Sequence, residues 1–545
     1  MDFAGKIMKK TLLAIAVLCI TVSVFGENTV FWGSTDVRYM QYERYAALPS
    51  PELSAWRGER VSAQAVISVD CDALVSAGAS DLKNGKGVIP ASCIECSFVD
   101  YVMADYYGRC GEYVSMQPDR LVPAGTTALA SGRTMPLWIS VQVPRETPTG
   151  KYKGSIVVTV NGRGHSLPFT LNVSGRTLPA PSQWSYHLDL WQNPYAVARY
   201  FDVPLWSDAH FKAMRPIMEK YASAGGKVIT ASIIRHPWNS QTFDPFESMV
   251  VKTKCLDGSW RYDYTVFDRW VEFALSCGVT EQIDCYSIVP WGYSFDYFDL
   301  ATSSVKQIDC EPGEQAYEDY ILPFLTDFAA HLKERGWFDR TCIAMDERPM
   351  EQLIAARKIV QSADPGFKIA GAVNYSPEVV DIMYDVSVCI NHSDLPESVL
   401  STREAEGRKT TIYTCCSPEH PNTFTFSPLA EAEYLGLSNA ARHYVGYLRW
   451  ALCSWPEDPC SDSRFRSWVS GDTYLLYPEG SSIRFERLLQ GVQDFEKVRI
   501  LREEGDPATE AALNRILAPF KEVVTDGSLD AAGLVRDAVA ELNRL

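Results

Sequence analysis

Strand-like and helix-like runs alternate from about residue 185 to residue 453, and this alternation restricts the possible fold more than any other feature. Each strand-like run is apolar and short enough for a buried β-strand. The eight runs are residues 185–190, 227–234, 282–289, 341–345, 367–373, 386–390, 409–415 and 446–453. Eight successive strand–helix units predict a (β/α)8 TIM barrel.

Helical segments fit between several of these strands. We expect one helix over 265–278, with Thr265 and Asp268 forming a capping box at its start. Others are expected over 314–336 and 350–365, where Gly336 and Pro365 stop them. The amphipathic stretch 481–503 predicts a closing helix, and the charged tail after it also has a helical pattern.

The region before the barrel has a different pattern. The segments "SAQAVISV", "PLWISVQV" and "GSIVVTV" alternate apolar and polar residues, which is typical of half-buried strands. Turn-rich pieces separate them, so residues 27–180 predict an antiparallel β-sandwich. Two prolines in 176–183 indicate a linker. Residues 181–545 then form the barrel domain with its helical C-terminal end.

The N-terminus has the features of a secretory signal peptide over residues 1–26. Lys9 and Lys10 precede an apolar run, and Gly26 is the expected cleavage region. An exported protein, periplasmic or secreted, is therefore predicted. A lipoprotein anchored at Cys19 is the alternative, which Leu18 disfavours because a small residue is expected there. No second long apolar run follows, so no transmembrane segment is expected.

The charge balance argues against one class of partner. The formal net charge of −17 repels phosphate backbones, so nucleic acid is not an expected partner. The 14 Trp and 27 Tyr suit sugar rings, whose apolar faces aromatic side chains cover, although most of these rings belong to the core.

Neither a metal nor a cofactor is expected. The sequence has no clustered metal ligands, no Walker loop, no G-x-S-x-G and no H-E-x-x-H. Cys93 and Cys96 form a lone C-x-x-C, for which a disulfide or free thiols are favoured over zinc. Five further cysteines fall in strand-like runs and are interpreted as small buried hydrophobic residues: Cys285, Cys342, Cys389, Cys415 and Cys453.

The ends of the strands supply the candidate binding residues, because TIM-barrel chemistry takes place where strands end and βα loops begin. These positions are aromatic and rich in amides, with few lysines, which suits a neutral ligand rich in hydroxyl groups. The candidates are Trp191, Asn193, Arg235, Trp238, Trp291, Asn374, Tyr375, Asn391, His392, Tyr413, Trp450 and Trp455.

Two adjacent carboxyl groups follow the fourth strand, in the segment "AMDERP". Repulsion between Asp346 and Glu347, together with desolvation, would raise one carboxyl pKa, as a general acid requires near neutral pH. Two structural interpretations compete. The pair could favour the N-terminus of the following helix, or it could form a salt bridge with Arg348.

The adjacency favours a particular catalytic arrangement. Most glycosidases place their two carboxyl groups on opposite sides of the scissile bond. Adjacent carboxyl groups instead reach neighbouring atoms, such as the glycosidic oxygen on C1 and the acetamide on C2 of a 2-acetamido sugar. One can protonate the leaving oxygen while the other orients the acetamide, whose carbonyl oxygen attacks C1. The nucleophile then belongs to the substrate.

The sequence resembles glycoside hydrolase family 123, the β-N-acetylgalactosaminidases, in the form found in gut Bacteroidetes. The resemblance covers nearly the whole chain after the signal peptide. It is carried by "WRGERVSAQAVI", "PDRLVP" and "VPRETPTGKYKG" in the first domain, and by "LDLWQNPYAVARY" and "MDERPM" in the barrel. Two long, unusual segments add to it: "LRWALCSWPEDPCSDSRFRSWVSGDTYLLYP" and "SSIRFERLLQGVQDFEKVRIL".

The resemblance implies an exo-acting, retaining enzyme that releases terminal β-linked N-acetylgalactosamine (GalNAc) through an oxazolinium intermediate. In the family pattern the Asp of the pair holds the acetamide and the Glu is the acid and then the base. These roles fall on Asp346 and Glu347. Glycosphingolipids or host glycans are the substrates it implies.

Two other functions remain open. One is the same mechanism acting on β-N-acetylglucosamine (GlcNAc) or another linkage. The other is a glycan-binding protein without activity, which the intact pair argues against.

Overall fold

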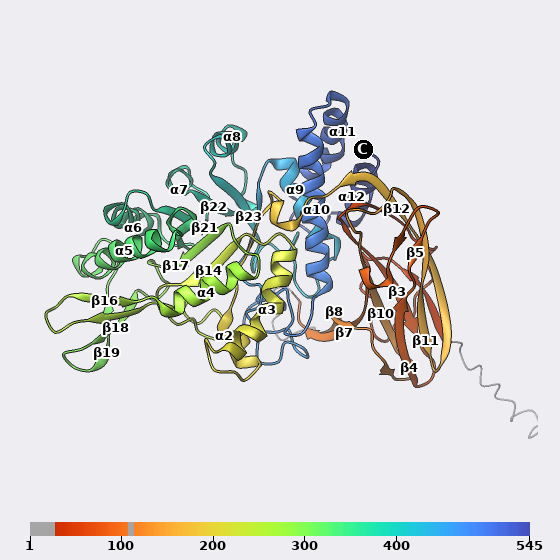
Figure 1. Cartoon of the computed structure of the whole chain (residues 1–545), viewed down its shortest axis with the longest axis horizontal. Helices are drawn as coiled ribbons and strands as arrows, with labels where there is room; N and C mark the ends of the chain where they lie inside the picture. Colours follow the sequence, from red (N-terminus) through yellow and green to blue (C-terminus); the bar gives the residue numbers. More distant parts are fainter. Residues whose placement is uncertain (1–27, 107–113) are drawn as a thin grey trace, which may run out of the picture.

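The computed structural model describes residues 28–106 and 114–545, so the predicted signal peptide lies outside the described residues. A β-sheet domain comes first along the chain, and a barrel with surrounding helices follows it (Figure 1). This is the predicted fold: an N-terminal antiparallel β-sheet domain followed by an eight-stranded, nearly closed parallel (β/α)8 barrel.

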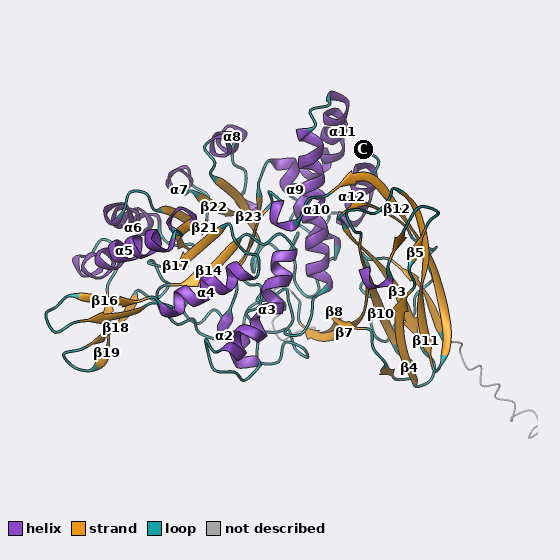
Figure 2. Cartoon of the chain, in the orientation of Figure 1, coloured by secondary structure: helices purple, strands orange, loops and turns teal. Residues whose placement is uncertain are grey.

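The N-terminal domain consists of two packed sheets (Figure 2). The first has the order β1-β3-β10-β7-β8, with bounds Thr29–Gly33, Arg60–Ser68, Thr134–Gln142, Ile94–Ala104 and Ser115–Pro123. The second has the order β2-β12-β11-β4-β9, with bounds Glu52–Arg57, Arg163–Thr177, Gly150–Val160, Ala73–Ala79 and Thr127–Leu129. The short strands β5 (Leu82–Lys83) and β6 (Val88–Ile89) extend it. Every pairing is antiparallel except that of β12 with β2.

Alternation along these strands explains why the sheets pack face to face. In β11, Tyr152, Ile156, Val158 and Val160 are buried, whereas Val157 between two of them is exposed. One face of the sheet therefore forms the apolar core and the other meets solvent.

The barrel contains all eight strands that the sequence predicts, so these eight predictions are confirmed. Their order is β13-β24-β23-β22-β21-β20-β17-β14, and every neighbouring pair is parallel. A hydrogen bond from Lys227 N to Leu188 O links β13 to the start of β14 and brings the sheet close to closure. The bounds along the chain are His187–Leu190 (β13), Val228–Ser232 (β14), Gln282–Tyr286 (β17), Thr341–Met345 (β20), Lys368–Val373 (β21), Asp385–Cys389 (β22), Lys409–Tyr413 (β23) and Gly446–Arg449 (β24).

Helices surround the barrel, and the last two pack on the helices before them rather than on the barrel strands (Figure 2). They are α2 (Pro194–Tyr200), α3 (Asp208–Ser223), α4 (Thr265–Ser276), α5 (Gln315–Arg335), α6 (Met350–Ala363), α7 (Pro377–Ile382), α8 (Glu397–Ala405), α9 (Ala430–Arg442), α10 (Ile483–Glu503), α11 (Pro507–Leu517) and α12 (Ala531–Leu542). Gly336 ends α5 in the left-handed conformation, as expected. No helix of the described residues has the length and apolarity needed to cross a bilayer.

The predicted capping box at α4 is wrong. Thr265 is the first residue of the helix, and its side chain is not the cap. Instead, Asp263 accepts hydrogen bonds from the Thr265 backbone N–H at 2.9 Å and from its hydroxyl at 2.6 Å. A capping residue two positions earlier therefore satisfies the first turn.

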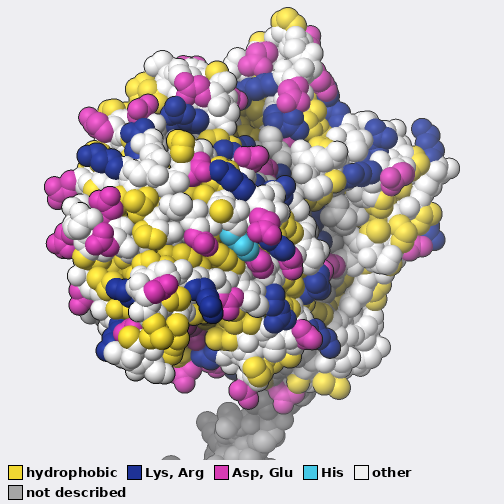
Figure 3. All heavy atoms as spheres, turned by 60° about the vertical axis from the view of Figure 1, so that its left-hand side comes forward, with side chains coloured by type: hydrophobic (Ala, Val, Ile, Leu, Met, Phe, Trp, Pro, Cys, Tyr) yellow, Lys and Arg dark blue, Asp and Glu magenta, His cyan; other side chains and the backbone are white. Residues whose placement is uncertain are grey.

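A small additional sheet was not expected from the sequence. Its strands are β15 (Val251–Lys254), β16 (Trp260–Asp263), β18 (Ser294–Asp299) and β19 (Ser304–Asp309), in the order β16-β15-β18-β19. They come from the loops after β14 and β17, and they project from the barrel on the side away from the β-sheet domain (Figure 1). Acidic and basic side chains are intermixed over the face that Figure 3 shows.

Candidate active site

Asp346 and Glu347 directly follow β20, at the carboxyl end of the barrel strands, and both side chains are half-buried. Each carboxyl group has its own hydrogen-bond donor. Trp291 donates its indole N–H to Oδ2 of Asp346 at 2.8 Å, and the Glu347 backbone N–H donates to Oδ1 at 2.9 Å. The Tyr413 hydroxyl donates to Oε1 of Glu347. Different partners therefore hold the two neighbouring carboxyl groups.

These carboxyl groups line a cavity of about 120 Å³. The other residues that line it are Trp191, Gln241, Trp291, Ala372, Tyr413, Cys415, Cys416, Leu448, Trp450 and Trp468. Trp450 and Trp468 lie against each other, with 5.3 Å between ring centroids, and Asp472 accepts the indole N–H of Trp450 at 3.0 Å. Four of the predicted binding residues, Trp191, Trp291, Tyr413 and Trp450, are thus brought together with the carboxyl pair.

Burial raises the pKa of both carboxyl groups. For Asp346, desolvation is the largest cause, and the hydrogen bonds from Trp291 and from the Glu347 N–H oppose it. For Glu347, desolvation again dominates, the Tyr413 hydroxyl opposes it, and the charge of Asp346 raises the pKa further. A raised pKa keeps a carboxyl group protonated closer to neutral pH, as a general acid needs.

Neither structural interpretation of the pair accounts for this geometry. Helix α6 begins at Met350 behind Pro349, and no side chain caps it. Arg348 forms no ion pair among the described residues. Its guanidinium lies over the rings of Trp291 and Tyr293, at 4.8 Å from each centroid. The two carboxyl groups point toward the cavity partners instead.

Three predicted binding residues are structural. The Oδ1 of Asn193 caps α2 by accepting the backbone N–H groups of residues 195 and 196. Trp455 is fully buried in the main core and donates its indole N–H to Leu476 O at 2.7 Å. Trp238 is buried behind the cavity wall, with its ring centroid 5.0 Å from that of Trp191. The expectation that these three residues line the cavity is not met. The Asn193 side chain caps a helix, and the rings of Trp238 and Trp455 pack in apolar clusters.

The remaining predicted residues also lie outside the cavity. Arg235 forms an ion pair with Glu247 at 3.0 Å. None of this group lines the cavity, and Asn374, Asn391 and His392 are exposed. The group comprises Arg235, Asn374, Tyr375, Asn391 and His392.

Six lining residues were missed. Ala372 lies within β21 and Leu448 within β24, and Cys415 and Cys416 follow β23 after Thr414, so the strand-end rule that selected the other residues could have found these four. The interpretation of Cys415 as a buried hydrophobic residue is wrong, because it is half-buried and faces the cavity, whereas the other four cysteines of that group are buried. Gln241 and Trp468 lie in long loops, well beyond β14 and β24, where the sequence gives no signal.

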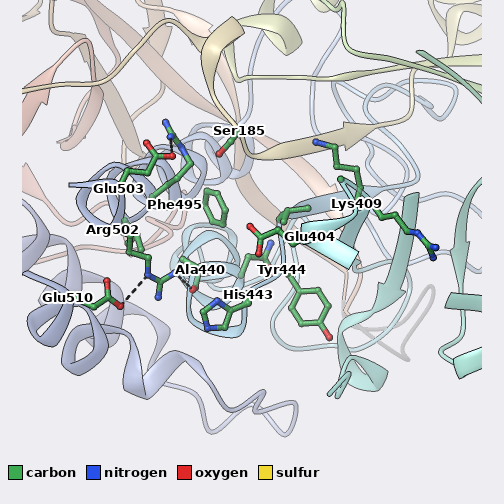
Figure 4. A pocket seen from close by; sticks show the side chains of 16 residues that line it. Ser185, Glu404, Lys409, Ala440, His443, Tyr444, Phe495, Arg502, Glu503 and Glu510 are labelled. Carbon is green, nitrogen blue, oxygen red and sulfur yellow. Dashed lines mark hydrogen bonds and ion pairs between the residues drawn. The ribbon is translucent and has the colours of Figure 1, made fainter. Parts of the chain in front are cut away.

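A larger cavity, of about 600 Å³, lies at the opposite end of the barrel (Figure 4). Its lining includes Ser185, Lys409 and Val445, which lie at or just before the first residues of β13, β23 and β24. Carboxylates pair with its basic side chains, for example Glu503 with Arg499 at 2.6 Å and Glu281 with Lys409 at 3.2 Å. The amino ends of barrel strands serve stability rather than catalysis.

A TIM barrel with two adjacent carboxyl groups under aromatic side chains, at the carboxyl ends of its strands, has the architecture of a glycoside hydrolase. The chain belongs to glycoside hydrolase family 123. Residues 191–501 match the glycoside hydrolase 123 catalytic domain, and residues 32–160 match the glycoside hydrolase 123 N-terminal domain. The predicted family is thereby confirmed.

A solved structure agrees with this assignment. It is that of a family 123 glycoside hydrolase from Clostridium perfringens, studied for glycolipid glycan hydrolysis, with a TM-score of 0.88 and 27% sequence identity. The match covers 95% of this chain and 97% of that one. A second solved structure, β-glucuronidase 3 of Bacteroides uniformis, is only remotely similar, with 8% identity and a TM-score of 0.30 over 86% of this chain and 52% of that one. No curated protein sequence matches the chain.

Proposed function

We propose that this chain is an exo-acting, retaining β-N-acetylgalactosaminidase that removes terminal β-linked GalNAc by substrate-assisted catalysis. The observation that carries the proposal is the adjacency of Asp346 and Glu347 in one cavity, with a separate donor on each carboxyl group. Family membership supports the reaction class.

The first half of the reaction forms a ring on the substrate. Ionised Asp346 accepts the acetamide N–H and holds the acetamide carbonyl oxygen beneath C1. Protonated Glu347 gives its proton to the glycosidic oxygen as the bond from C1 breaks. The carbonyl oxygen bonds to C1, and Asp346 stabilises the positive charge of the resulting oxazolinium ion.

The second half reverses the proton transfer. Glu347, now ionised, takes a proton from water as the water oxygen attacks C1. The ring opens, the acetamide is restored, and the sugar leaves with its original anomeric configuration. Two displacements at C1 account for retention.

The composition of the cavity supports a nucleophile on the substrate. Among the described residues that line it, Asp346 and Glu347 are the only acidic ones. A conventional retaining enzyme needs a second carboxylate about 5–5.5 Å away across the scissile bond. The rest of the described lining consists of aromatic and aliphatic side chains, two thiols and one amide.

The proposed substrates are terminal GalNAc residues of glycosphingolipids or other host glycans. The glycolipid glycan hydrolysis named for the Clostridium perfringens relative supports this choice, as do the tryptophans of the cavity, which can cover a sugar face.

We also propose that the chain is exported to the periplasm or secreted, and that it is of the Bacteroidetes type. GlcNAc-specific activity and glycan binding without catalysis remain the competing functions.

Nitrophenyl glycosides test the proposal. We expect rapid release of nitrophenol from the β-GalNAc glycoside, weaker release from β-GlcNAc, and essentially none from β-galactoside, which lacks the acetamide. A thiazoline that mimics the cyclic intermediate should inhibit strongly. Strong β-galactosidase activity would require a nucleophile on the enzyme and would refute the mechanism, whereas inertness toward all three glycosides would favour glycan binding.

A further inference from the structure

Three cysteines meet beside the carboxyl pair. Cys389 ends β22, and Cys415 and Cys416 follow the neighbouring strand β23. The Sγ atoms of Cys415 and Cys416 are 3.9 Å apart. The sulfurs of Cys415 and Cys389 both approach the Ser417 carbonyl oxygen, at 3.7 and 3.9 Å. All three thiols are free, so the group is not a preformed disulfide.

The surroundings of Cys415 favour its thiolate. Hydrogen bonds with the thiols of Cys389 and Cys416 lower the pKa of Cys415, burial opposes them, and a backbone hydrogen bond at Ser417 and the Arg449 guanidinium add smaller lowering effects. The same hydrogen bonds raise the pKa values of Cys389 and Cys416. The thiolate is the nucleophilic form of cysteine. The Cys415 sulfur therefore combines a lowered pKa with contact to the Cys416 sulfur and a place in the cavity lining.

Access is the second requirement, and the cavity supplies it. Cys415 and Cys416 are half-buried and line the same cavity as Asp346 and Glu347, whereas Cys389 is buried. A small molecule that enters the cavity can therefore reach the Cys415 sulfur. A group attached there would occupy the space above the carboxyl pair.

We propose that the Cys415–Cys416 pair is a thiol-modification site for low-molecular-weight disulfides, with Cys415 as the attacking sulfur, and that its mixed disulfide closes the substrate cavity. The Cys415 thiolate attacks one sulfur of the disulfide. A new S–S bond forms, the old one breaks, and the other half leaves as a thiolate. An added free thiol reverses the exchange. The loss of activity rests on the proposed function, but the covalent step does not.

The test treats the whole protein with 5,5′-dithiobis(2-nitrobenzoate) for short times and maps the adducts by peptide mass spectrometry. Cys255 is the matched comparator, because it is also half-buried but lies next to β15, outside the cavity. We expect Cys415 to react about tenfold faster than Cys255, since the thiolate fraction and access set the rate. An internal Cys415–Cys416 disulfide, formed when the second thiol displaces the first adduct, would identify the pair as the modified site, and the adducts at the shortest times assign the attacking sulfur.

Activity provides a second readout. Loss of β-GalNAc hydrolysis should follow the Cys415 reaction, and dithiothreitol should restore it. Cys415→Ser protein should retain most of its own untreated activity after the reagent, whereas Cys255→Ser protein should be inactivated like the parent. Free GalNAc should slow the reaction of Cys415 but not that of the exposed Cys71.

Three results would overturn the proposal. One is equal or faster reaction of Cys255, another is an adduct on Cys416 alone, and the third is full activity with Cys415 modified. If the chain hydrolyses none of the glycosides, the proposed function fails, but the peptide map still decides whether Cys415 is the reactive thiol.

Discussion

At the scale of single residues, the two carboxyl groups differ because their donors differ. Asp346 receives hydrogen bonds from the Trp291 indole and a backbone N–H, and Glu347 receives one from Tyr413. Donors to a carboxylate favour its ionised form, and burial disfavours it. Two donors on Asp346 suit a group that works ionised, and a single one on Glu347 suits a group that starts protonated.

Tyr413→Phe tests this balance. The hydroxyl stabilises ionised Glu347 and so lowers its pKa against desolvation. Without it the pKa of Glu347 rises, so the acid stays protonated to higher pH. The basic limb of kcat/KM on a GalNAc-terminated oligosaccharide should move upward by about one pH unit, which corresponds to 1.36 kcal/mol.

A buried tyrosine with a different partner provides the control. The Tyr447 hydroxyl lies 2.5 Å from that of Thr414 and does not contact Glu347. Tyr447→Phe should leave the basic limb where it is. A downward shift in Tyr413→Phe would mean that the hydroxyl does not stabilise the Glu347 carboxylate.

Part of the site could be predicted residue by residue. The strand-end rule found Trp191, Trp291, Tyr413 and Trp450 because each lies at or soon after a barrel strand. It misplaced Trp455, because the direction in which a loop turns depends on tertiary packing. Gln241 and Trp468 reach the cavity only through the paths of their long loops, which local sequence does not encode.

At the scale of elements, helices α9 and α10 cross in close contact. A Cβ added at Gly436 would overlap the Gly491 carbonyl, and one added at Gly491 would lie 2.6 Å from the Glu433 carbonyl oxygen. Two glycines thus allow the backbones to approach closely. The closing helix α10 is thereby fixed against the barrel.

Gly436→Ala should force these helices apart. Overpacking of a dense core costs about 1–3 kcal/mol, and a backbone obstacle belongs at the upper end of that range or above it. Urea unfolding should report the loss. Gly78→Ala is the control, because a Cβ there meets nothing within 4 Å and the site is exposed, so its effect should stay within about 0.5 kcal/mol. Equal stability of the two variants would contradict the close crossing.

The sequence predicts some elements better than others. The barrel strands are buried apolar runs, so composition alone marks them, as in β20 where all five residues are buried. The hairpins β15–β16 and β18–β19 are short and mostly half-buried, and their strands mix aromatic, charged and polar residues. The spacing of apolar residues along these strands therefore shows no clear period of two.

At the scale of the whole molecule, buried ion pairs join the β-sheet domain to the barrel. Asp119 of β8 binds Arg484 of α10 through contacts of 2.9–3.0 Å and accepts the Tyr477 hydroxyl at 2.7 Å. Both members of the ion pair are buried. A second buried pair, Glu59 with Lys497 at 2.5 Å, lies further along the same helix. The closing helix is therefore shared by both domains.

Asp119→Asn should weaken this junction strongly. Removing one member of a buried pair leaves an uncompensated charge and costs about 3–5 kcal/mol. The free energy of unfolding in urea should fall by that amount. Glu541→Gln, which breaks the exposed pair with Arg515, should cost less than about 1 kcal/mol. A loss in Asp119→Asn no larger than that of the control would show that the domains do not depend on the pair.

In the proposed mechanism Asp346 acts on the substrate acetamide, and Asp346→Asn distinguishes this role from a purely structural one. The change keeps the size of the side chain, so a purely structural Asp would tolerate it at a cost of about 1 kcal/mol or less. Asparagine cannot stabilise the charge that develops along the reaction path. We predict a nearly unchanged Tm and a loss of at least about 100-fold in kcat on nitrophenyl β-GalNAc. A kcat within a few-fold of the parent would contradict the substrate-assisted mechanism.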